Sequence, residues 1–547
     1  MKNSIFKIAG MGLLALSLVG CNKFLSQNPD DRTQINDVDA ARELGVTAYP
    51  EYHYAPLFEL RSDDVGDKSS RLSPLSSFHT NMYLFDETVP STYQDSPQGY
   101  WRSCYNAVGT ANQVLKDLDR IGATGEKADA TRGEMYMVRA YTMYMLAQTF
   151  TIPYDPATAA TDLGLPYPTE PEDVLIKEYK RGTLKELYEN IVKDFEAGYK
   201  LVTDDYKVVK YHFNRQAAAA FGTRLYRTLQ NWDRVLELGH AAVGDQLGAF
   251  VRKINDPKSM YQGTINEQAE VWGAETEAAN FMIATFMSAW CRAYKIGWYG
   301  EPRFGLTWPG GGRPGIARQV FWGPNFLNTP EPGKANKYQA AYPFYGAGNT
   351  AYAPKIKEHF EVTNKSTGTG FLYTQAILLS GDEVLFNMAE AYAMKNDFTK
   401  VEELLQLFVS HFFKNYKEAD PKFKVSKDNI SKYYQDKVGK ILPDPVYGIE
   451  INSFNPTFTT TPEQEMYLRA CLDMKRIGFI HDGMRWMDNR QYRMDIVHNV
   501  LSQGDAKQEF IVLRGNSPRY AYQLPSNVLP YLEKNPGYDT EIERISK

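Results

Sequence analysis

Long stretches of helical periodicity constrain the fold of this chain more than any other feature. In Tyr100–Arg120, apolar residues recur three and four positions apart, which places them on one face of a helix. Thr131–Phe150 is apolar around most of its circumference and ends before Pro153, which lacks an amide donor and restricts the residue before it. A third run, Gly182–Leu201, starts with Thr183 and a glutamate three residues later, the pattern of a capping box. We therefore expect a mainly α fold.

Two later segments resemble each other. Tyr226 is followed six residues later by Trp232, and Tyr392 is followed six residues later by Phe398. In both, a polar turn separates two amphipathic stretches, as in the helix-turn-helix unit of a tetratricopeptide array. The match is degenerate, and any helical hairpin can produce it, but two copies favour an array. The sequence predicts a tetratricopeptide-like helical hairpin array.

The region from about 290 to 353 is different. It is rich in glycine and proline, which forbid long helices. Four of the eight tryptophans fall between Trp290 and Trp322. A loop of this length in a compact domain is usually functional or disordered, and so many aromatic residues argue against disorder. We predict a long irregular, loop-rich insertion that carries a function.

The amino terminus has the features of a lipoprotein signal. Lys2 and Lys7 supply positive charge, Ile8–Val19 is a short apolar core, and Gly20 precedes Cys21. We interpret residues 1–20 as a lipoprotein signal peptide, Cys21 as the lipidation site, 21–39 as a lipid-anchored tether and 40–547 as a single helical body. The alternative is an ordinary secreted protein with an incidental cysteine.

Composition excludes several classes of protein. Of 547 residues, 43% are hydrophobic and 23% charged, which is ordinary globular usage. The net charge of -5 shows no basic face, so nucleic acid is not an expected partner. Apart from Cys21, the cysteines are Cys104, Cys291 and Cys471, an odd and sparse set that is no disulfide framework. We expect Cys104 and Cys471 to be buried free thiols.

The chain carries no recognisable catalytic motif. It has no G-x-S-x-G, no H-E-x-x-H, no P-loop and no C-x-x-C, and no spacing singles out a pair of glycosidase carboxylates. His53 and His481 are isolated and are interpreted as packing or surface residues. We expect no enzyme activity, no metal site and no cofactor.

Short motifs are spaced along nearly the whole chain. They start with Cys21-Asn22-Lys23-Phe24-Leu25 and Asn28-Pro29. An early W-x-x-x-Y…A-N-x-x-L helix is matched by Trp101, Tyr105, Ala111-Asn112 and Leu115, and a G-E-A-x-x-x-R-A helix is matched by Gly133-Glu134, Arg139-Ala140 and Tyr144. A late E-R-x-x-E-x-x-x-E-G-x-R-W-x-D stretch is matched by Met474-Lys475-Arg476, Gly478-Phe479, Asp482-Gly483, Arg485-Trp486 and Asp488. A closing P…N-P-G-Y is matched by Pro525 and Asn535-Pro536-Gly537-Tyr538. In this order they resemble the SusD/RagB family, the nutrient-binding lipoproteins of the Bacteroidetes outer membrane.

The chain departs from the family pattern at three places. Met135 replaces an alanine of the second motif, and Lys475 and Ile477 stand in the late stretch where acidic residues are usual. Lys23 occupies a position where the family often has an acid, which weakens any inference about surface export from the tether alone. The missing acidic residues of the late stretch indicate a divergent branch of the family.

The resemblance implies a function and a partner. Such a protein lies on the outer membrane, facing the cell exterior, and caps a SusC-like TonB-dependent barrel to which it delivers oligosaccharide. Oligopeptide is the alternative cargo, and the basic residues Arg292, Arg303, Arg313 and Arg318 could hold either peptide carboxylates or an anionic glycan. A surface scaffold that binds proteins without transport is a further alternative.

Two regions are candidates for the ligand site. Trp298, Trp308 and Trp322, with Tyr299, lie in the insertion beside glycine or proline, and an indole face is a common anchor for a ligand; the alternative is that they fold inward and hold the loop to the helices. The second region, Tyr52–Arg71, contributes Arg61, Asp63, Asp64 and Arg71, whose planar groups suit bidentate bonds to hydroxyls, or else form local ion pairs. We expect Glu134, Arg139 and Arg485, within the shared motifs, to form buried ion pairs instead of ligand contacts.

Overall fold

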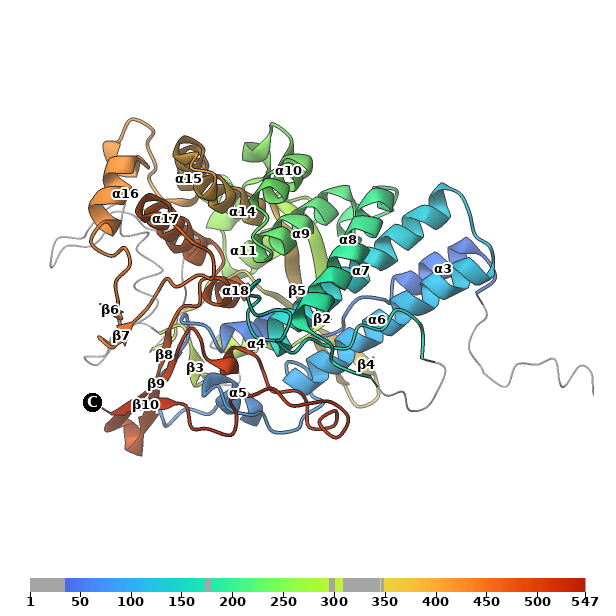
Figure 1. The fold of residues 1–547 in the computed structure, drawn as a ribbon, viewed down its shortest axis with the longest axis horizontal. Helices are drawn as coiled ribbons and strands as arrows, with labels where there is room; N and C mark the ends of the chain where they lie inside the picture. The colour runs from blue at the N-terminus through green and yellow to red at the C-terminus, as the bar shows by residue number, and fades with distance from the viewer. Residues whose placement is uncertain (1–34, 173–178, 295–300, 308–344, 346–348, 547) are drawn as a thin grey trace, which may run out of the picture.

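The computed structural model describes residues 35–172, 179–294, 301–307, 345 and 349–546. Its amino-terminal part is a set of long helices, α3 (Val38–Gly45), α6 (Pro97–Arg120), α7 (Glu126–Phe150) and α8 (Leu184–Leu201). Helix α7 packs between α6 and α8, and α3 lies against α6 and α7 (Figure 1). Thr183 and Glu186 form the predicted capping box at the start of α8. The three predicted helices are confirmed.

The two repeated segments form matching helical hairpins. Helices α9 (Arg215–Thr228) and α10 (Trp232–Val243) make the first, and α14 (Gly381–Met394) and α15 (Phe398–Phe412) make the second. At equivalent places in the two turns, Gln230 has φ 60° and Asn396 has φ 62°. The next residue, Asn231 or Asp397, caps the second helix with its side chain. Helix α10 packs on α14, so the hairpins stack as the predicted tetratricopeptide-like array.

A buried charge network joins these hairpins to the carboxyl-terminal helices α17 (Pro462–Gly478) and α18 (Met484–Gln491). Arg227 donates to Glu390 at 2.7 Å and to Asp488 at 2.8 Å. Lys475 donates to Asp488 at 2.8 Å and lies 3.6 Å from Glu390, which also accepts from Tyr492. Two cations thus neutralise two carboxylates in a place without solvent, and Lys475, a departure from the family motif, is one of the cations.

Charged residues of the shared motifs form buried pairs as predicted. Arg139 holds Asp194 of α8 with two bonds of 2.6 and 2.7 Å. Glu134 accepts from Tyr49 at 2.6 Å and lies 2.8 Å from a ring nitrogen of His212. These contacts fix how α7 packs on its neighbours, which confirms their structural role.

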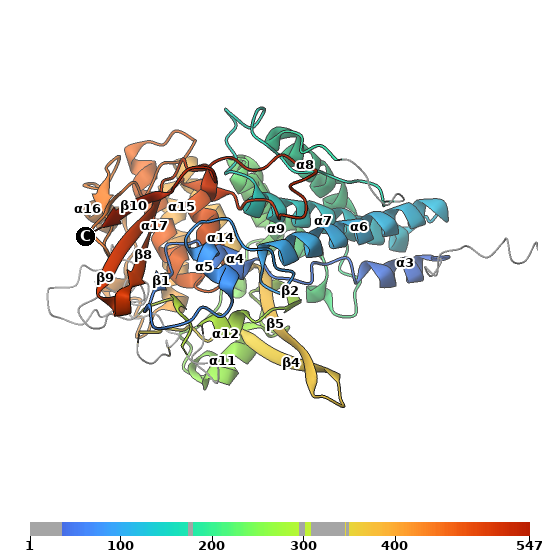
Figure 2. The same ribbon diagram turned by 90° about the horizontal axis from the view of Figure 1, so that it is seen from below.

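The described residues also form four groups of strands, which lie beside the helices. One sheet has the order β2 (Asn280–Met287), β5 (Thr369–Ser380), β4 (Lys357–Asn364), all antiparallel, and its β4–β5 hairpin projects from the body (Figure 2). A second sheet joins β8 (Ile496–Ser502), β9 (Lys507–Leu513) and β10 (Glu543–Ser546). The short pairs β1 (Gly66–Asp67) with β3 (Phe304–Gly305), and β6 (Leu442–Pro443) with β7 (Glu450–Ile451), complete the strands. The remaining helices are α4 (Ala55–Glu59), α5 (Ser77–Tyr83), α11 (Ile265–Trp272), α12 (Trp290–Tyr294) and α16 (Lys427–Tyr434).

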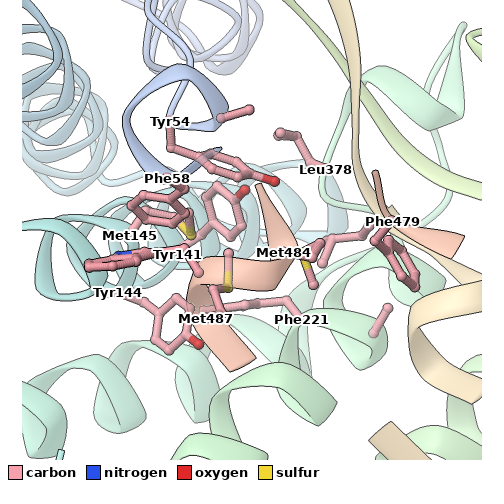
Figure 3. Packing of buried hydrophobic residues seen from close by; sticks show 14 of the residues in the cluster. Tyr54, Phe58, Tyr141, Tyr144, Met145, Phe221, Leu378, Phe479, Met484 and Met487 are labelled. Atoms are coloured by element: carbon pink, nitrogen blue, oxygen red, sulfur yellow. The ribbon is translucent and has the colours of Figure 1, made fainter. Parts of the chain in front are cut away.

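Aromatic side chains fill much of the core. Tyr141 and Tyr144 of α7 meet Phe221 of α9 edge to face, with centroids 5.3 and 5.7 Å apart, inside a cluster that also holds Phe58 and Met487 (Figure 3). A buried tyrosine needs a partner for its hydroxyl, and Tyr144 has one in Thr228 at 2.9 Å. The high tyrosine content therefore serves packing to a large extent.

The cysteines of the described ranges, Cys104, Cys291 and Cys471, are buried free thiols, which confirms the expectation for two of them. Among the described helices, none combines the length and the apolar composition that crossing a membrane requires.

Candidate functional site

The two regions predicted to bind ligand meet in the structure. We call residues 61–73 the 61–73 segment, and the described residues 301–307 and 349–353 the insertion base. Strand β1 of the segment pairs antiparallel with β3 of the insertion base, with Gly66 opposite Gly305 and Asp67 opposite Phe304. Two further backbone bonds, from Lys68 to Arg303 and from Arg303 to Ser73, extend this contact. The base of the insertion is therefore paired with the candidate segment near the amino terminus.

An ion pair between Arg303 and Asp67 holds the β1–β3 junction together. Arg303 donates to both oxygens of Asp67, at 3.0 and 2.7 Å, and to the carbonyl of Leu501 in β8. Asp67 also accepts from the amide of Leu501 at 3.0 Å. Its backbone is bonded to the side chain of Asn499, which donates to its carbonyl and accepts from its amide. The bidentate geometry and the full satisfaction of Asp67 make this junction a rigid support.

Lys68 joins the 61–73 segment to residues 349–353 of the insertion base. Lys68 Nζ donates to Thr350 Oγ1 at 2.9 Å, and the Thr350 hydroxyl donates to Glu301. Asn349 donates to the Lys68 carbonyl. Burial lowers the pKa of the Lys68 amine to about 7, although the nearby carboxylates of Glu301 and Asp67 act to raise it. Near neutral pH this amine is therefore neutral in a large fraction of molecules, and it then both donates and accepts hydrogen bonds.

The outer end of the segment is a polar loop on the 3-10 turn Gln503–Asp505. Asp505 accepts from the Ser69 hydroxyl at 2.7 Å and from the Ser70 amide at 2.6 Å. Arg71 is exposed and donates to the Gly504 carbonyl at 3.3 Å. Among the predicted ligand residues of this segment, Arg71 has the most solvent-exposed side chain, which leaves it able to reach a ligand.

Arg61 lies inside the protein. It is fully buried, donates to the Arg519 carbonyl at 2.9 Å and to the Tyr538 hydroxyl at 3.2 Å, and lies 3.5 Å from the ring centroid of Tyr522. These partners belong to the closing segment of the chain. They hold Arg61 in the interior, away from solvent.

Asp63 and Asp64 are held by the late motif. Asp63 accepts from Arg485 at 2.7 and 2.8 Å and from Asn489 at 3.0 Å, and Asp64 accepts from Arg476 at 2.6 Å. Burial alone would raise the pKa of Asp63, but Arg476 and Arg485 hold it well below its usual range. The predicted ion-pair role of Arg485 is confirmed. Asp64 is buried, whereas Asp63 is partly exposed and lines a cavity.

The remaining predicted residues are placed only in part. Trp298, Tyr299, Trp308 and Trp322 lie outside the described residues, as do Arg313, Arg318 and Cys21. Arg292 lies 3.1 Å from both oxygens of Glu358, and Arg303 is paired with Asp67. Ligand contact by the predicted residues therefore stays a prediction.

The two isolated histidines lie in the interior. His53 and His481 are buried, and burial lowers the pKa of each to about 3. The Nε2 atom of His481 accepts from the Ala353 amide at 3.2 Å, so its Nδ1 carries the proton and donates to Glu59. Within the described ranges, no His, Cys, Asp or Glu side chains gather as a group that would hold a metal ion.

Sequence reasoning missed Asp67, Lys68 and Thr350. Lys68 and Thr350 are 282 positions apart, and their contact follows from the β1–β3 pair, whose strands have two residues each. Strands this short leave no periodicity to detect. The density of turns after Trp290 located the insertion, but nothing local showed where it is anchored.

Comparison with known proteins gives a family match and a fold match. Residues 23–227 match the model of the SusD-like_3 family, described as starch-binding and associating with the outer membrane. No curated protein matches the chain.

Solved structures from Bacteroides share the fold. A candidate sugar-binding protein from Bacteroides vulgatus superposes with a TM-score of 0.61 at 17% identity, covering 93% of this chain and 100% of that one. A SusD superfamily protein from Bacteroides thetaiotaomicron has a TM-score of 0.59 at 14% identity, covering 92% and 100%. A SusD-like carbohydrate-binding protein from Bacteroides vulgatus has a TM-score of 0.55 at 13% identity, covering 91% and 97%. At these identities the similarity shows the fold alone.

Proposed function

Because residues 23–227 match the SusD-like_3 family model, we propose that the chain is a SusD-like outer-membrane lipoprotein that binds a glycan and passes it to a SusC-like TonB-dependent barrel. The family is described as starch-binding and as associating with the outer membrane. An α-1,4-glucan is therefore the first ligand to test.

The observation that carries the proposal is the β1–β3 junction. It joins the 61–73 segment to the base of an insertion that contains Trp298, Trp308 and Trp322. A ligand site made of loops needs a rigid frame beneath it, because ordering a mobile loop costs conformational entropy on binding. Asp67 and Arg303 supply such a frame.

Binding without catalysis fits the residues. The buried histidines His53 and His481 have pKa values lowered to about 3, far from the range useful for general acid–base work at neutral pH. The Asp63 carboxylate is held ionised by two arginines of the late motif, Arg476 and Arg485. We therefore assign the chain no reaction.

Oligopeptide is the alternative cargo, and specific contacts weigh against one argument for it. Arg292 and Arg303, offered above as partners for peptide carboxylates, are both paired with carboxylates of the protein itself, Glu358 and Asp67. A surface scaffold without a transport role leaves the aromatic insertion without a purpose. We keep glycan as the proposed cargo.

A titration calorimetry panel tests the choice of cargo. Maltoheptaose and a mixture of unstructured heptapeptides are titrated separately into the detergent-solubilised full chain. We expect saturable heat with maltoheptaose and none with the peptides. Saturable binding of peptide, with no response to maltoheptaose, would reverse the assignment.

The anchor and the partner belong to the same proposal. Residues 1–20 act as signal peptide, Cys21 carries the lipid, residues 21–39 are the tether and 40–547 form one body. Cys21→Ala should move the protein from the membrane fraction to the soluble fraction or leave it unprocessed. Affinity purification under gentle detergent conditions should recover a large outer-membrane barrel with the wild-type chain, and recovery of a free monomer alone counts against the partnership.

A further inference from the structure

A cavity lies between α16, α17 and the β6–β7 pair, with Asp63 of the 61–73 segment in its lining. It has a volume of about 240 Å³ and is lined by Asp63, Tyr433, Lys437, Leu442, Asp473 and Arg476, among others. We call it the Asp63 cavity. All its lining residues belong to the described part of the chain, and none belongs to the insertion.

Contacts within the protein hold the charged residues around Asp63 in place. Arg476 and Arg485 both hold Asp63, with Arg485 bonded at 2.7 and 2.8 Å and Arg476 at 3.5 Å. Arg476 is in turn fixed by Asp64 at 2.6 Å. Because each of these groups is already held by a partner, binding of a ligand costs little free energy for their reorganisation.

The rest of the lining has a polar, aromatic part and an apolar part. On one side, α16 brings Tyr433 and Tyr434, and the Tyr434 hydroxyl donates to Asp473 of α17. Lys437 lies at the end of this part, 3.2 Å from the centroid of the Tyr433 ring. Another part of the lining is apolar and comes from Leu442, Pro443 and Ile451 of the β6–β7 pair.

The charges of the cavity nearly cancel. Three carboxylates and four cations line it. Behind two of the cations, Arg469 and Arg476, lie the carboxylates of Glu465 and Asp64, at 2.8 and 2.6 Å. A strongly charged ligand would therefore find no matching net charge. A neutral ligand with several hydroxyls would find donors, acceptors and an apolar wall together.

We propose that the Asp63 cavity is a second carbohydrate site, which takes one neutral sugar unit of a glycan with its polar edge toward Asp473 and Lys437 and its apolar face toward Leu442. Pockets for drug-sized ligands enclose about 300–1,000 Å³, so a cavity of about 240 Å³ suits one ring better than a chain. This inference rests on the proposed glycan-binding function. It adds a contact between glycan and protein that does not involve the insertion.

Protection of Lys437 from acylation tests the proposal directly. Lys437 is half-buried in the lining of the cavity, and its amine can be labelled with a water-soluble succinimidyl ester. With maltoheptaose at ten times its dissociation constant, the labelling rate of Lys437 should fall about tenfold, because only the free fraction reacts. Lys432 on α16 is exposed and does not line the cavity, so its rate should stay unchanged. Mass spectrometry of peptides from the full chain gives both rates, and equal Lys437 rates with and without maltoheptaose overturn the proposal.

Matched variants separate this site from the insertion. Leu442→Trp fills the cavity and should abolish the protection of Lys437, whereas Ile441→Trp, at a neighbouring residue that is 65% exposed, should leave it intact. In a chain with Trp298, Trp308 and Trp322 all changed to alanine, protection of Lys437 should persist. Its loss there, or its survival in Leu442→Trp, contradicts the proposal. Protection of Lys437 together with unchanged maltoheptaose affinity in the triple variant would instead count against the insertion site alone.

Discussion

Removing Lys475 tests whether the buried charge network holds the helical array together. The side chains of Lys475 and Asp488 are 1% exposed, that of Glu390 is 0% exposed and that of Arg227 is 4% exposed. Lys475→Met leaves two carboxylates with one cation in a place that water does not reach. Loss of one partner from a buried ion pair typically costs about 3–5 kcal/mol.

This cost converts into a measurable shift of the melting temperature. An unfolding entropy of about 2.1 cal/mol/K per residue gives roughly 1 kcal/mol/K for a chain of 547 residues that unfolds as one unit, so Tm should fall by about 3–5 °C. Differential scanning calorimetry measures it. Lys395→Met is the matched control, because Lys395 pairs with Asp233 at the surface, where both side chains are largely exposed. Exposed pairs contribute about 0.2–1 kcal/mol, so this control should shift Tm by about 1 °C or less.

A compensating change completes the test. Glu390→Gln in the Lys475→Met chain restores a neutral network while its amide oxygen still accepts from Tyr492. The double variant should recover most of the lost stability. If Lys475→Met melts no lower than Lys395→Met, or if Glu390→Gln adds to the loss, the charge-balance argument is refuted.

Three further predictions concern other parts of the fold. Arg61→Ala should lower Tm because Arg61 is fully buried among the closing residues, whereas Arg71→Ala should leave Tm unchanged and weaken maltoheptaose binding; calorimetry measures both, and a destabilised Arg71→Ala protein would contradict the assignment. Burial, reinforced by Asp482, raises the pKa of Glu59 from 4.5 to about 8. The stability contributed by this carboxyl is therefore present below its unfolded pKa and lost as pH rises through 8, so Glu59→Gln should remove part of the decline in Tm over that interval, and a parallel pH profile of the two proteins would speak against it. Trp232 is only half-buried, against Phe458, so Trp232→Ala should cost less than the about 3–5 kcal/mol of a fully buried aromatic residue in urea unfolding, and a larger loss would show a tighter interface.

The helical part of the fold was predictable because its signals are local and repeated. The spacing of Tyr226 and Trp232, and of Tyr392 and Phe398, reports a turn between two helices, and the structure places a left-handed residue in each turn. The capping box of Thr183 and Glu186 likewise depends on neighbours three residues apart. Motif arginines such as Arg139 were correctly expected in buried pairs, although their partner Asp194 could not be named.

The projecting β4–β5 hairpin was not predicted, and its burial explains why. Strand β4 has eight residues and β5 has twelve. Phe360 and Val362 alternate along β4 but are 49% and 44% exposed, so the strand has no buried face that would set a clear hydrophobic pattern. Contacts such as Lys68 with Thr350 escaped for a different reason, because they depend on the tertiary fold.

The central proposal is glycan capture by aromatic residues of the insertion. Changing Trp298, Trp308 and Trp322 singly to alanine, and measuring maltoheptaose affinity and Tm for each variant, tests this claim most directly. Loss of a hot-spot contact of about 2 kcal/mol weakens binding roughly thirtyfold. We predict such a loss, with unchanged Tm, for at least one of the three, while Trp486→Ala, at a fully buried position, lowers Tm. If all three changes lower Tm and none alters the affinity for maltoheptaose, the insertion is not the glycan site.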